Sequence, residues 1–283
     1  MNTKHNTQSQ YRQGWSLDER DPKFIASLMP YWKWFYKYYF RVKTDGWHHI
    51  PEKGPLLLVG SHNGGLASPD TSMMMYDWFS RFGIERPAYG LMHQSIWTIN
   101  PSAANFAVQV GAVRAHSRMG IAALKRGASV LVYPGGAQDV FRPYTNRHKI
   151  ELAGRKGFLK LALREKSPII PVISVGAHET LIILGDCYQQ AKQMNEWGIL
   201  PWLFNVDPEV FPLYLGLPWG IGIGPLPNFP LPVAIHTRVC PPIIFKRYGR
   251  EAASDRFYVD ACYELVRSQM QQHLDQLVID SKN

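Results

Sequence analysis

Short runs of apolar residues recur along the chain, each bounded by proline, glycine or polar positions. The run at 56–59 follows a Pro-Gly turn and contains no polar residue, a pattern typical of a strand that is buried on both faces. Runs of the same kind occur at 85–93, 110–115, 128–136, 167–176 and 231–243. We expect a strand in each of these six segments.

Amphipathic stretches lie between several of these runs. Apolar positions recur at helical spacing in 117–127 and 151–166, and residues 254–280 carry the same pattern near the end of the chain. Strands that alternate with helices over most of the chain predict an α/β fold. We therefore expect a mixed, largely parallel central sheet covered by helices.

The segment before the first strand is rich in aromatic residues. A Ser-x-x-Glu capping pattern at Ser16 and Glu19 precedes a helix expected within 23–41, which Pro30 should break or restart. The stretch YWKWFYKYYF at 31–40 interleaves aromatic rings with lysines. A helix at a membrane interface, with rings at headgroup depth and lysines reaching lipid phosphates, explains this pattern. A helix packed on the core with its lysines reaching solvent explains it equally well.

The segment 197–232 is apolar but dense in proline and glycine. Such a composition predicts neither a long helix nor a regular pair of strands. We expect an extended loop that caps the sheet and that is apolar enough to contact lipid or to line a groove for an acyl chain.

Composition narrows the class of protein. With 283 residues and 46% hydrophobic content, the chain can bury one large core, and we expect a disordered N-terminus at 1–20 followed by a single domain at 21–283. Three cysteines without paired or zinc-ligand spacing indicate a reducing compartment and no metal site. There is no secretory signal pattern and no apolar run long enough to span a bilayer, so we expect a cytoplasmic protein, peripherally associated with a membrane.

The formal net charge of +9 favours an anionic partner, such as an anionic bilayer or a phosphorylated small molecule. The basic residues are scattered rather than gathered in blocks, so nucleic acid is not expected as a partner. A basic but otherwise ordinary surface is the alternative.

Two strand ends carry candidate chemistry, and His62 lies at the first of them. It follows the run at 56–59 and precedes Gly64 and Gly65, an order that puts a side chain at the carboxyl edge of a sheet, where α/β proteins bind ligands. An imidazole with a pKa near ~6.5 can accept a proton at neutral pH. A lone histidine after a strand is nevertheless more often structural.

The second strand end is the tripeptide Pro134, Gly135 and Gly136, followed by Asp139. The two glycine amides could donate to a developing oxyanion, where one donor typically contributes about 3–4 kcal/mol. A plain tight turn is the alternative, because Pro-Gly is a common turn signal.

A basic segment follows this second strand end. Such a cluster could hold the phosphates of a nucleotide-derived carrier or of a phospholipid. For any single member, a solvated helix face is the more common explanation. The members are Arg142, Arg147, His148, Lys149, Arg155 and Lys156.

Four stretches occur in order along the chain: SHNGGLASPD from 61, GAVRAHS from 111, YPGGAQD from 133 and GRKGFLKLALREKSPIIPVISVG from 154. Together they resemble the glycerolipid acyltransferase superfamily, which includes lysophosphatidate acyltransferases and type 2 diacylglycerol acyltransferases. Within it, the chain resembles the bacterial and plastid monoacylglycerol-acyltransferase-like branch, which includes phytyl-ester-synthase-type enzymes.

The resemblance implies transfer of a fatty acyl group from acyl-CoA or acyl carrier protein to a lipid hydroxyl. It implies His62 as general base, no covalent acyl-enzyme, no metal and no cofactor other than the thioester co-substrate. The substrate-binding positions that it implies, together with the basic segment, are Gly64, Gly65, Pro134, Gly135, Gly136, Asp139, Arg147, Lys149, Arg155 and Lys156.

The chain departs from the superfamily at the carboxylate that would hold His62. The common block has an aspartate five positions after the histidine, where this chain has Ala67, and the first acid is Asp70. If residues 64–69 loop out before a helix begins near Asp70, its carboxylate can reach back to His62. Asp139 is the alternative partner, and Asp70 could be only a helix N-cap. We favour Asp70.

The form of the second motif bears on the acceptor. Pro-Gly-Gly stands in place of the Pro-Glu-Gly of phosphate-acceptor enzymes, which favours a neutral alcohol such as diacylglycerol, phytol or a quinol over lysophosphatidate. Two other functions stay open: a non-catalytic lipid-binding or membrane-remodelling protein, and a thioesterase in which His62 activates water.

Overall fold

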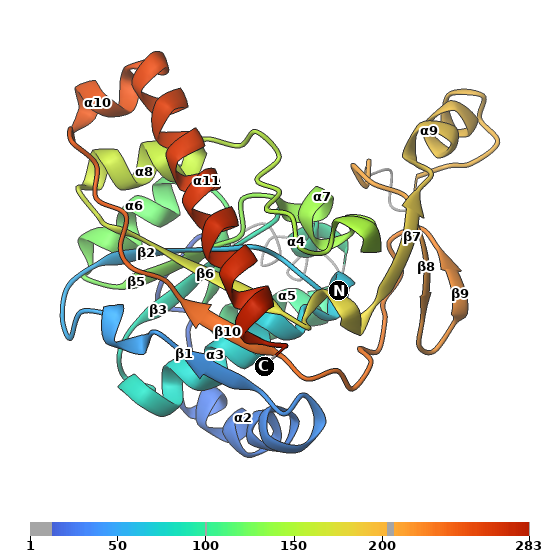
Figure 1. The fold of residues 1–283 in the computed structure, drawn as a ribbon, viewed down its shortest axis with the longest axis horizontal. Coiled ribbons are helices and arrows are strands. Elements are labelled where there is room, and N and C mark those ends of the chain that lie inside the picture. The colour runs from blue at the N-terminus through green and yellow to red at the C-terminus, as the bar shows by residue number, and fades with distance from the viewer. Residues whose placement is uncertain (1–12, 100, 203–206, 283) are drawn as a thin grey trace, which may run out of the picture.

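A seven-stranded sheet forms the centre of the protein in the computed structural model, which describes residues 13–99, 101–202 and 207–282. Its strands are β1 (Lys43–Asp45), β2 (Leu56–Gly60), β3 (Ala88–Met92), β4 (Ala112–Arg114), β5 (Ser129–Val132), β6 (Ile169–Val175) and β10 (His236–Val239). They lie in the order β1-β10-β6-β2-β5-β3-β4 (Figure 1). Five strands are parallel, and β10 pairs antiparallel with β6, so the expected mixed, largely parallel sheet is confirmed.

Helices cover both faces of this sheet. The longer ones are α2 (Pro22–Trp34), α3 (Pro69–Phe82), α5 (Pro101–Gln109), α6 (Ser117–Lys125), α8 (Gly157–Glu165) and α11 (Arg256–Asp280), whereas α9 (Tyr188–Glu196) lies away from this sheet (Figure 1). The short helical segments are α4 (Ile96–Ile99), α7 (Gly136–Val140), α10 (Arg250–Ser254), the π-helical turn η1 (Phe35–Tyr39) and the 3-10 turns η2 (Trp47–His49), η3 (Gly65–Ala67), η4 (Tyr144–Asn146) and η5 (His178–Thr180).

The central strand β2 shows why its apolar run has no polar gap. Leu57 and Val59 belong to a core cluster with residues of α6, α8 and α11 on one face. Leu56 and Leu58 belong to a second cluster with residues of α2 and α3 on the other. Because successive side chains of a strand point to opposite faces, a sheet covered on both sides needs apolar residues at every position.

The N-terminal region differs in detail from the prediction. The expected disordered N-terminus at 1–20 falls largely on residues 1–12, which lie outside the described residues, whereas Leu17 is buried in the core. The first helix begins at Pro22, close to the expected range of 23–41, and its cap is Asp21, whose carboxylate accepts from the amides of Lys23 and Phe24, rather than the Ser16 pattern.

Pro30 does not interrupt this helix. Residues 22–34 are continuous through it, and η1 extends the helical path to Tyr39. Ala26, whose carbonyl Pro30 leaves without its usual helical donor, lies with Pro30 on the exposed side. Water can therefore satisfy that carbonyl, which makes a proline inside this helix tolerable.

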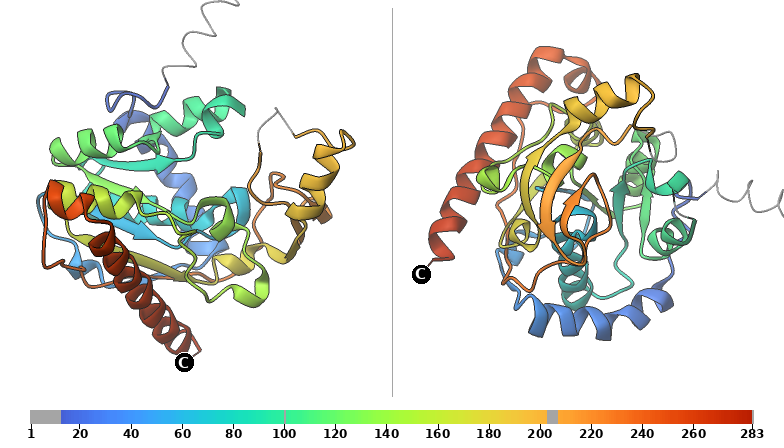
Figure 2. Two further views of the ribbon diagram at one scale, coloured as in Figure 1. Left: turned by 90° about the horizontal axis from the view of Figure 1, so that it is seen from above. Right: turned by 90° about the vertical axis from the view of Figure 1, so that its right-hand side faces the viewer.

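A second, three-stranded sheet corrects the prediction for 197–232. The strands β7 (Ile182–Asp186), β8 (Pro212–Gly216) and β9 (Gly220–Ile223) pair antiparallel, and with α9 they project from the main body (Figures 1 and 2). The segment therefore contains a regular hairpin and does not cap the central sheet. We call β7, β8 and β9 the small sheet.

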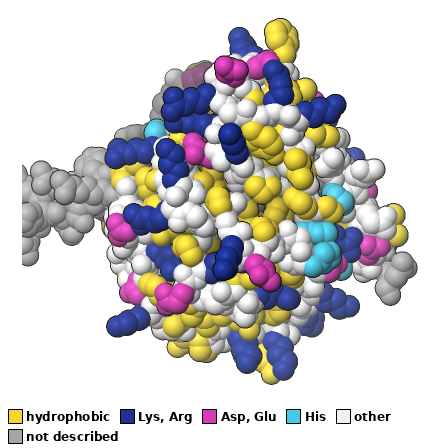
Figure 3. All heavy atoms as spheres, turned by 90° about the vertical axis from the view of Figure 1, so that its left-hand side faces the viewer, with side chains coloured by type: hydrophobic (Ala, Val, Ile, Leu, Met, Phe, Trp, Pro, Cys, Tyr) yellow, Lys and Arg dark blue, Asp and Glu magenta, His cyan; other side chains and the backbone are white. Residues whose placement is uncertain are grey.

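Charged side chains are dispersed over the opposite side of the molecule. On the face turned away from the small sheet, lysines and arginines lie singly or in small groups among apolar and acidic side chains (Figure 3). Within the described ranges, no helix is both long enough and apolar enough to cross a membrane.

Candidate active site

The loop between β2 and α3 holds His62 at the carboxyl edge of the central sheet. Gly64 and Gly65 have φ angles of +80° and +67°, and Ser68 has +43°. A left-handed backbone at Gly64 and Gly65 costs little because glycine has no Cβ. The chain makes the turn η3 and begins α3 at Pro69, so residues 64–68 loop out ahead of the helix.

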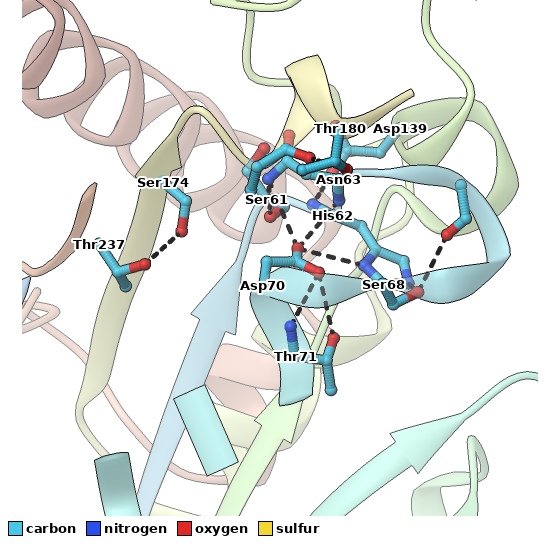
Figure 4. Close-up of polar contacts among 12 residues, drawn as sticks. Ser61, His62, Asn63, Ser68, Asp70, Thr71, Asp139, Ser174, Thr180 and Thr237 are labelled. Atoms are coloured by element: carbon cyan, nitrogen blue, oxygen red, sulfur yellow. Dashed lines mark hydrogen bonds and ion pairs between the residues drawn. The ribbon is translucent and has the colours of Figure 1, made fainter. Parts of the chain in front are cut away.

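This loop brings the Asp70 carboxylate back to the histidine (Figure 4). His62 Nδ1 lies 3.4 Å from Asp70 Oδ2. The carboxylate is almost fully buried and accepts from the backbone amides of Asn63 at 2.9 Å and Thr71 at 2.8 Å. Hydrogen bonds from these amides fix the position of the carboxylate beside the imidazole.

Tyr133 and Ser68 complete the surroundings of the imidazole. The Tyr133 ring stacks on His62 with centroids 4.5 Å apart and an interplanar angle of 20°. Burial raises the pKa of the Tyr133 phenol well above its usual range, with the Asp70 charge adding to the effect, so this phenol stays protonated. On the far side of the imidazole, Nε2 lies 3.5 Å from Ser68 Oγ.

Asp139, the alternative partner, does not contact the imidazole. Its carboxylate accepts from the backbone amide of His62 and pairs with Arg142 Nη1 at 2.6 Å. Complete burial raises the pKa of Asp139 to about 6, although the Arg142 charge opposes this. At neutral pH the carboxylate is therefore mostly ionised and bound to the guanidinium.

Arg142 is the hub that joins the two strand ends. Its side chain is buried and donates to the His62 carbonyl at 2.8 Å, to Asn63 Oδ1 at 2.6 Å and to the Arg147 carbonyl at 2.8 Å. The Arg142 carbonyl lies 2.8 Å from His178 Nε2. Burial lowers the pKa of His178 to about 3, so this imidazole is neutral and donates to that carbonyl.

An apolar cavity of about 250 Å³ adjoins the histidine. Its lining includes His62, Ser68 and Tyr133 from the site itself. Most of the remaining wall is hydrophobic, and it comes from α3, β3 and β5, including Met74, Met75, Trp78, Leu91 and Leu131. A proton-accepting side chain therefore borders a space suited to a hydrocarbon chain.

The Pro-Gly-Gly strand end lies on the same side of the sheet. Gly136 lines the cavity, and a Cβ on it would come within 2.3 Å of an Arg155 guanidinium nitrogen. A Cβ on Gly135 would come within 2.1 Å of the Glu151 carbonyl oxygen. The Gly136 amide already donates to the Tyr133 carbonyl at 3.2 Å. An oxyanion role for these two amides stays a prediction.

Most of the basic segment is paired with acids that lie far along the chain. One of the paired residues, Arg155, lies near Gly136 and donates to the Pro134 carbonyl. Lys149 lines a separate polar pocket. The pairs are Arg147–Glu179 at 3.5 Å, His148–Glu179 at 3.4 Å, Lys156–Asp260 at 2.7 Å and Arg155–Glu209.

Asn228 is a site residue that the sequence analysis missed. Its Oδ1 accepts from the Ala67 amide at 3.2 Å, and its Nδ2 donates to the Gly64 carbonyl at 3.1 Å. The side chain thus spans both ends of the turn η3. No local pattern marks this residue, whereas Asn63 and Tyr133 stand directly beside residues that the motifs had singled out.

No group of three or more histidine, cysteine, aspartate or glutamate side chains in the described ranges is placed to hold a metal ion.

Comparison with known proteins points to one family. The family model described as diacylglycerol acyltransferase matches residues 28–247. An uncharacterized protein of Mycobacterium tuberculosis is 28% identical over 272 residues, which cover 95% of this chain and 71% of that protein. Diacylglycerol O-acyltransferase 2 of Danio rerio is 33% identical over 97 residues, 32% of this chain and 27% of that protein.

Among solved structures, the 1-acyl-sn-glycerophosphate acyltransferase of Thermotoga maritima aligns with a TM-score of 0.47 and 16% identity, over 89% of this chain and 79% of that one. The family model spans most of the chain and includes both glycine-bearing strand ends. The protein belongs to the diacylglycerol acyltransferase family and is an acyltransferase.

Proposed function

We propose that this enzyme transfers a fatty acyl group from an acyl thioester, either acyl-CoA or acyl carrier protein, to the hydroxyl of a lipid alcohol. The observation that carries the proposal is the His62–Asp70 pair, 3.4 Å apart, at the border of an apolar cavity. A base oriented by a carboxylate suits proton removal from a hydroxyl. The adjoining cavity suits the hydrocarbon chain of an acyl donor.

In the proposed mechanism, His62 Nε2 takes the proton of the acceptor hydroxyl while its oxygen attacks the thioester carbonyl. Collapse of the tetrahedral intermediate breaks the carbon–sulfur bond, and the imidazolium returns the proton to the leaving thiolate. The products are an ester and a free thiol. Asp70 accepts from the protonated Nδ1, and the 3.4 Å separation is of the kind that tightens when substrate binds.

Asp139 takes a structural role in this proposal. It holds the backbone of His62 and neutralises Arg142, and it reaches the reaction only through these groups. Asp139 is thus a positioning residue, whereas Asp70 acts on the catalytic imidazole directly.

A neutral acceptor is favoured over lysophosphatidate. Arg142, Arg147, Arg155 and Lys156 are each engaged by a carboxylate of the chain itself, so a phosphate bound by any of these four would have to displace an existing pair. Diacylglycerol, phytol or a quinol needs no such site. The Pro-Gly-Gly-Ala-Gln stretch supports placing the chain in the bacterial and plastid monoacylglycerol-acyltransferase-like branch of the superfamily.

Peripheral membrane association is part of the proposal. The aromatic segment divides its rings between two environments: Phe40 is buried and Trp32 packs on the core, whereas Tyr31, Trp34 and Tyr38 are exposed. This arrangement combines the two explanations of the sequence pattern, since one side packs on the core and the other can lie at a membrane interface.

The catalytic pair is tested by three substitutions. His62→Ala should abolish acyl transfer, and Asp70→Asn should lower kcat by about 10²–10⁴-fold, because the imidazolium loses its acceptor. Asp139→Asn should cost kcat much less than Asp70→Asn does. The assay follows a labelled acyl group into lipid ester, with circular dichroism as the control for folding.

Two outcomes of this assay would contradict the proposal. Full residual transfer in His62→Ala would exclude the base mechanism. Wild-type protein that releases no thiol with any acceptor would favour the lipid-binding alternative, and thiol release without an acceptor would favour a thioesterase.

Asp139 should give the folded protein a measurable pH dependence. Between its ordinary pKa of 3.8 and its raised pKa of about 6, the folded chain keeps a proton that the unfolded chain has released. This contribution favours folding at acid pH and is lost as the pH rises through 6. Relative to Asp139→Asn, the free energy of unfolding of the wild type should fall by about 3 kcal/mol from about pH 4 to about pH 7, measured by urea denaturation. A pH-independent difference would refute the raised pKa.

Asn228 should act on turnover through the catalytic loop. Asn228→Ala removes both hydrogen bonds across η3, and we expect kcat to fall by about 10–100-fold with little change in the KM for the acyl donor. Asn195→Ala is the matched control, because Asn195 also bonds a backbone carbonyl but lies on α9. Equal kcat values for the two variants, or a change confined to KM, would show that Asn228 does not position His62.

The acceptor preference is tested by competition. With labelled acyl-CoA and equal amounts of diacylglycerol, phytol and lysophosphatidate in mixed micelles, we expect at least a tenfold preference for the neutral alcohols, because the paired arginines and lysine hold no free phosphate site. Preferential acylation of lysophosphatidate would contradict this expectation, and Arg155→Gln would then show whether the Arg155–Glu209 pair had opened to receive it.

A further inference from the structure

The small sheet has apolar residues on both of its faces. On the inner face, Ile183 and Tyr214 are fully buried and pack with Val140, Phe141 and Leu181 of the main body. An antiparallel sheet with one face on the core normally carries polar residues on the other. Here the outer face consists of Ile182, Leu184, Leu213, Leu215, Ile221 and Ile223, of which Ile221 is 72% and Ile223 54% exposed.

This apolar surface continues beyond the strands. Leu217 and Trp219, in the turn between β8 and β9, are both about half exposed. The Phe229 amide bonds to the Leu217 carbonyl, and the Phe229 ring lies 5.8 Å from the ring of Tyr39 in η1. The Tyr39 ring in turn lies 6.1 Å from that of Trp34. These contacts connect the small sheet, at the right of Figure 1, to the aromatic end of α2, at the bottom of that view.

The charges along this surface are ordered. No charged or histidine residue occurs between Glu209 and His236, the stretch that forms β8, β9 and the turn between them. At the aromatic edge, Lys33 and Lys37 are exposed, and the Lys37 ammonium lies 5.3 Å from the Tyr38 ring. An uncharged surface bordered by aromatic rings and cations matches the change from acyl chains to phosphates across one leaflet of a bilayer.

The same features argue against a protein as the occupant. Protein interfaces carry a polar rim with hydrogen bonds around their apolar centre. The outer face of the small sheet offers no polar side chain, and large apolar patches on the surface of a lone protein mark membrane or partner contacts. The cationic aromatic edge favours lipid phosphates among these.

We propose that the outer face of the small sheet, together with Leu217, Trp219 and Phe229, inserts into a lipid bilayer, with Lys33 and Lys37 at the level of the lipid phosphates. The small sheet thus extends the exposed rings of α2 into a larger apolar surface. The docking itself does not depend on the proposed acyltransferase mechanism.

The surface also adjoins the catalytic loop. Asn228, which bonds the Gly64 carbonyl and the Ala67 amide, is next to Phe229, and Leu66 at the tip of that loop is exposed. A lipid alcohol dissolved in the bilayer would thus meet the protein beside His62. This point, unlike the docking, rests on the proposed function.

The test measures partition of the purified full chain onto vesicles of phosphatidylcholine with about one-fifth phosphatidylglycerol, by flotation. Ile221→Thr with Ile223→Thr should lower the partition coefficient at least tenfold, because two aliphatic side chains leave the bilayer. Threonine keeps the β-branched shape that suits a strand. Ile244→Thr with Phe257→Thr is the matched control, since these residues are 72% and 90% exposed away from the small sheet. That pair should change partition less than twofold.

Three results would overturn the docking proposal. The first is a wild-type partition coefficient for the β9 variant, which carries Ile221→Thr and Ile223→Thr. The second is an equal loss of partition in the β9 variant and the control. The third is a lipid-free dimer that the β9 substitutions convert to a monomer, which would make the face a contact between two copies. Thermal unfolding checks that both variants are folded. Transfer activity in detergent micelles separates the two proposals: the β9 variant should keep it, and its absence even in the wild type would count against the proposed function while leaving the partition result intact.

Discussion

The buried guanidinium of Arg142 is the interaction on which the site depends. A guanidinium presents five N–H donors in a rigid planar fork, and here they reach the His62 carbonyl, Asn63 Oδ1, the Asp139 carboxylate and the carbonyls of Asn146 and Arg147. A buried charge is tolerated only when it is paired and its donors are satisfied. Asp139 supplies the charge, and the Asn63 side chain and the backbone of two separate loops supply the remaining acceptors. The positions of both strand ends are thus set by one side chain.

The fold was largely predictable because its strands and helices follow patterns within short stretches of sequence. All six predicted strands are present. An apolar run marks a strand that is buried on both faces, as in β2 throughout and in β6 except at Ser174. Two local rules failed where tertiary context outweighed them. Pro30 is tolerated inside α2 because the Ala26 carbonyl, which it leaves without a helical donor, lies on the exposed side. The small sheet forms despite its prolines and glycines, and Gly222 leaves room there for the Tyr214 ring.

The site was predictable only in part. His62, Asp70 and the Pro-Gly-Gly end lie in short motifs that are recognised by their order along the chain. Residues 64–69 were expected to loop out before a helix near Asp70, and α3 begins at Pro69. The ion pairs of the basic segment could not be predicted, because their acidic partners, such as Glu209 and Asp260, lie far away in sequence. Asn228 had no signal at all, because a residue that acts across 160 positions leaves no local pattern.

The length of the catalytic loop has a consequence for how this enzyme can be recombined with its relatives. Asn228 bonds both ends of the turn η3, which lies within the eight positions from His62 to Asp70. In a chimera with a shorter histidine block, the Asn228 side chain would lose these partners, and Leu181 would lose its contact with Gly65. The histidine block and the segment around residue 228 are therefore exchangeable only as a pair.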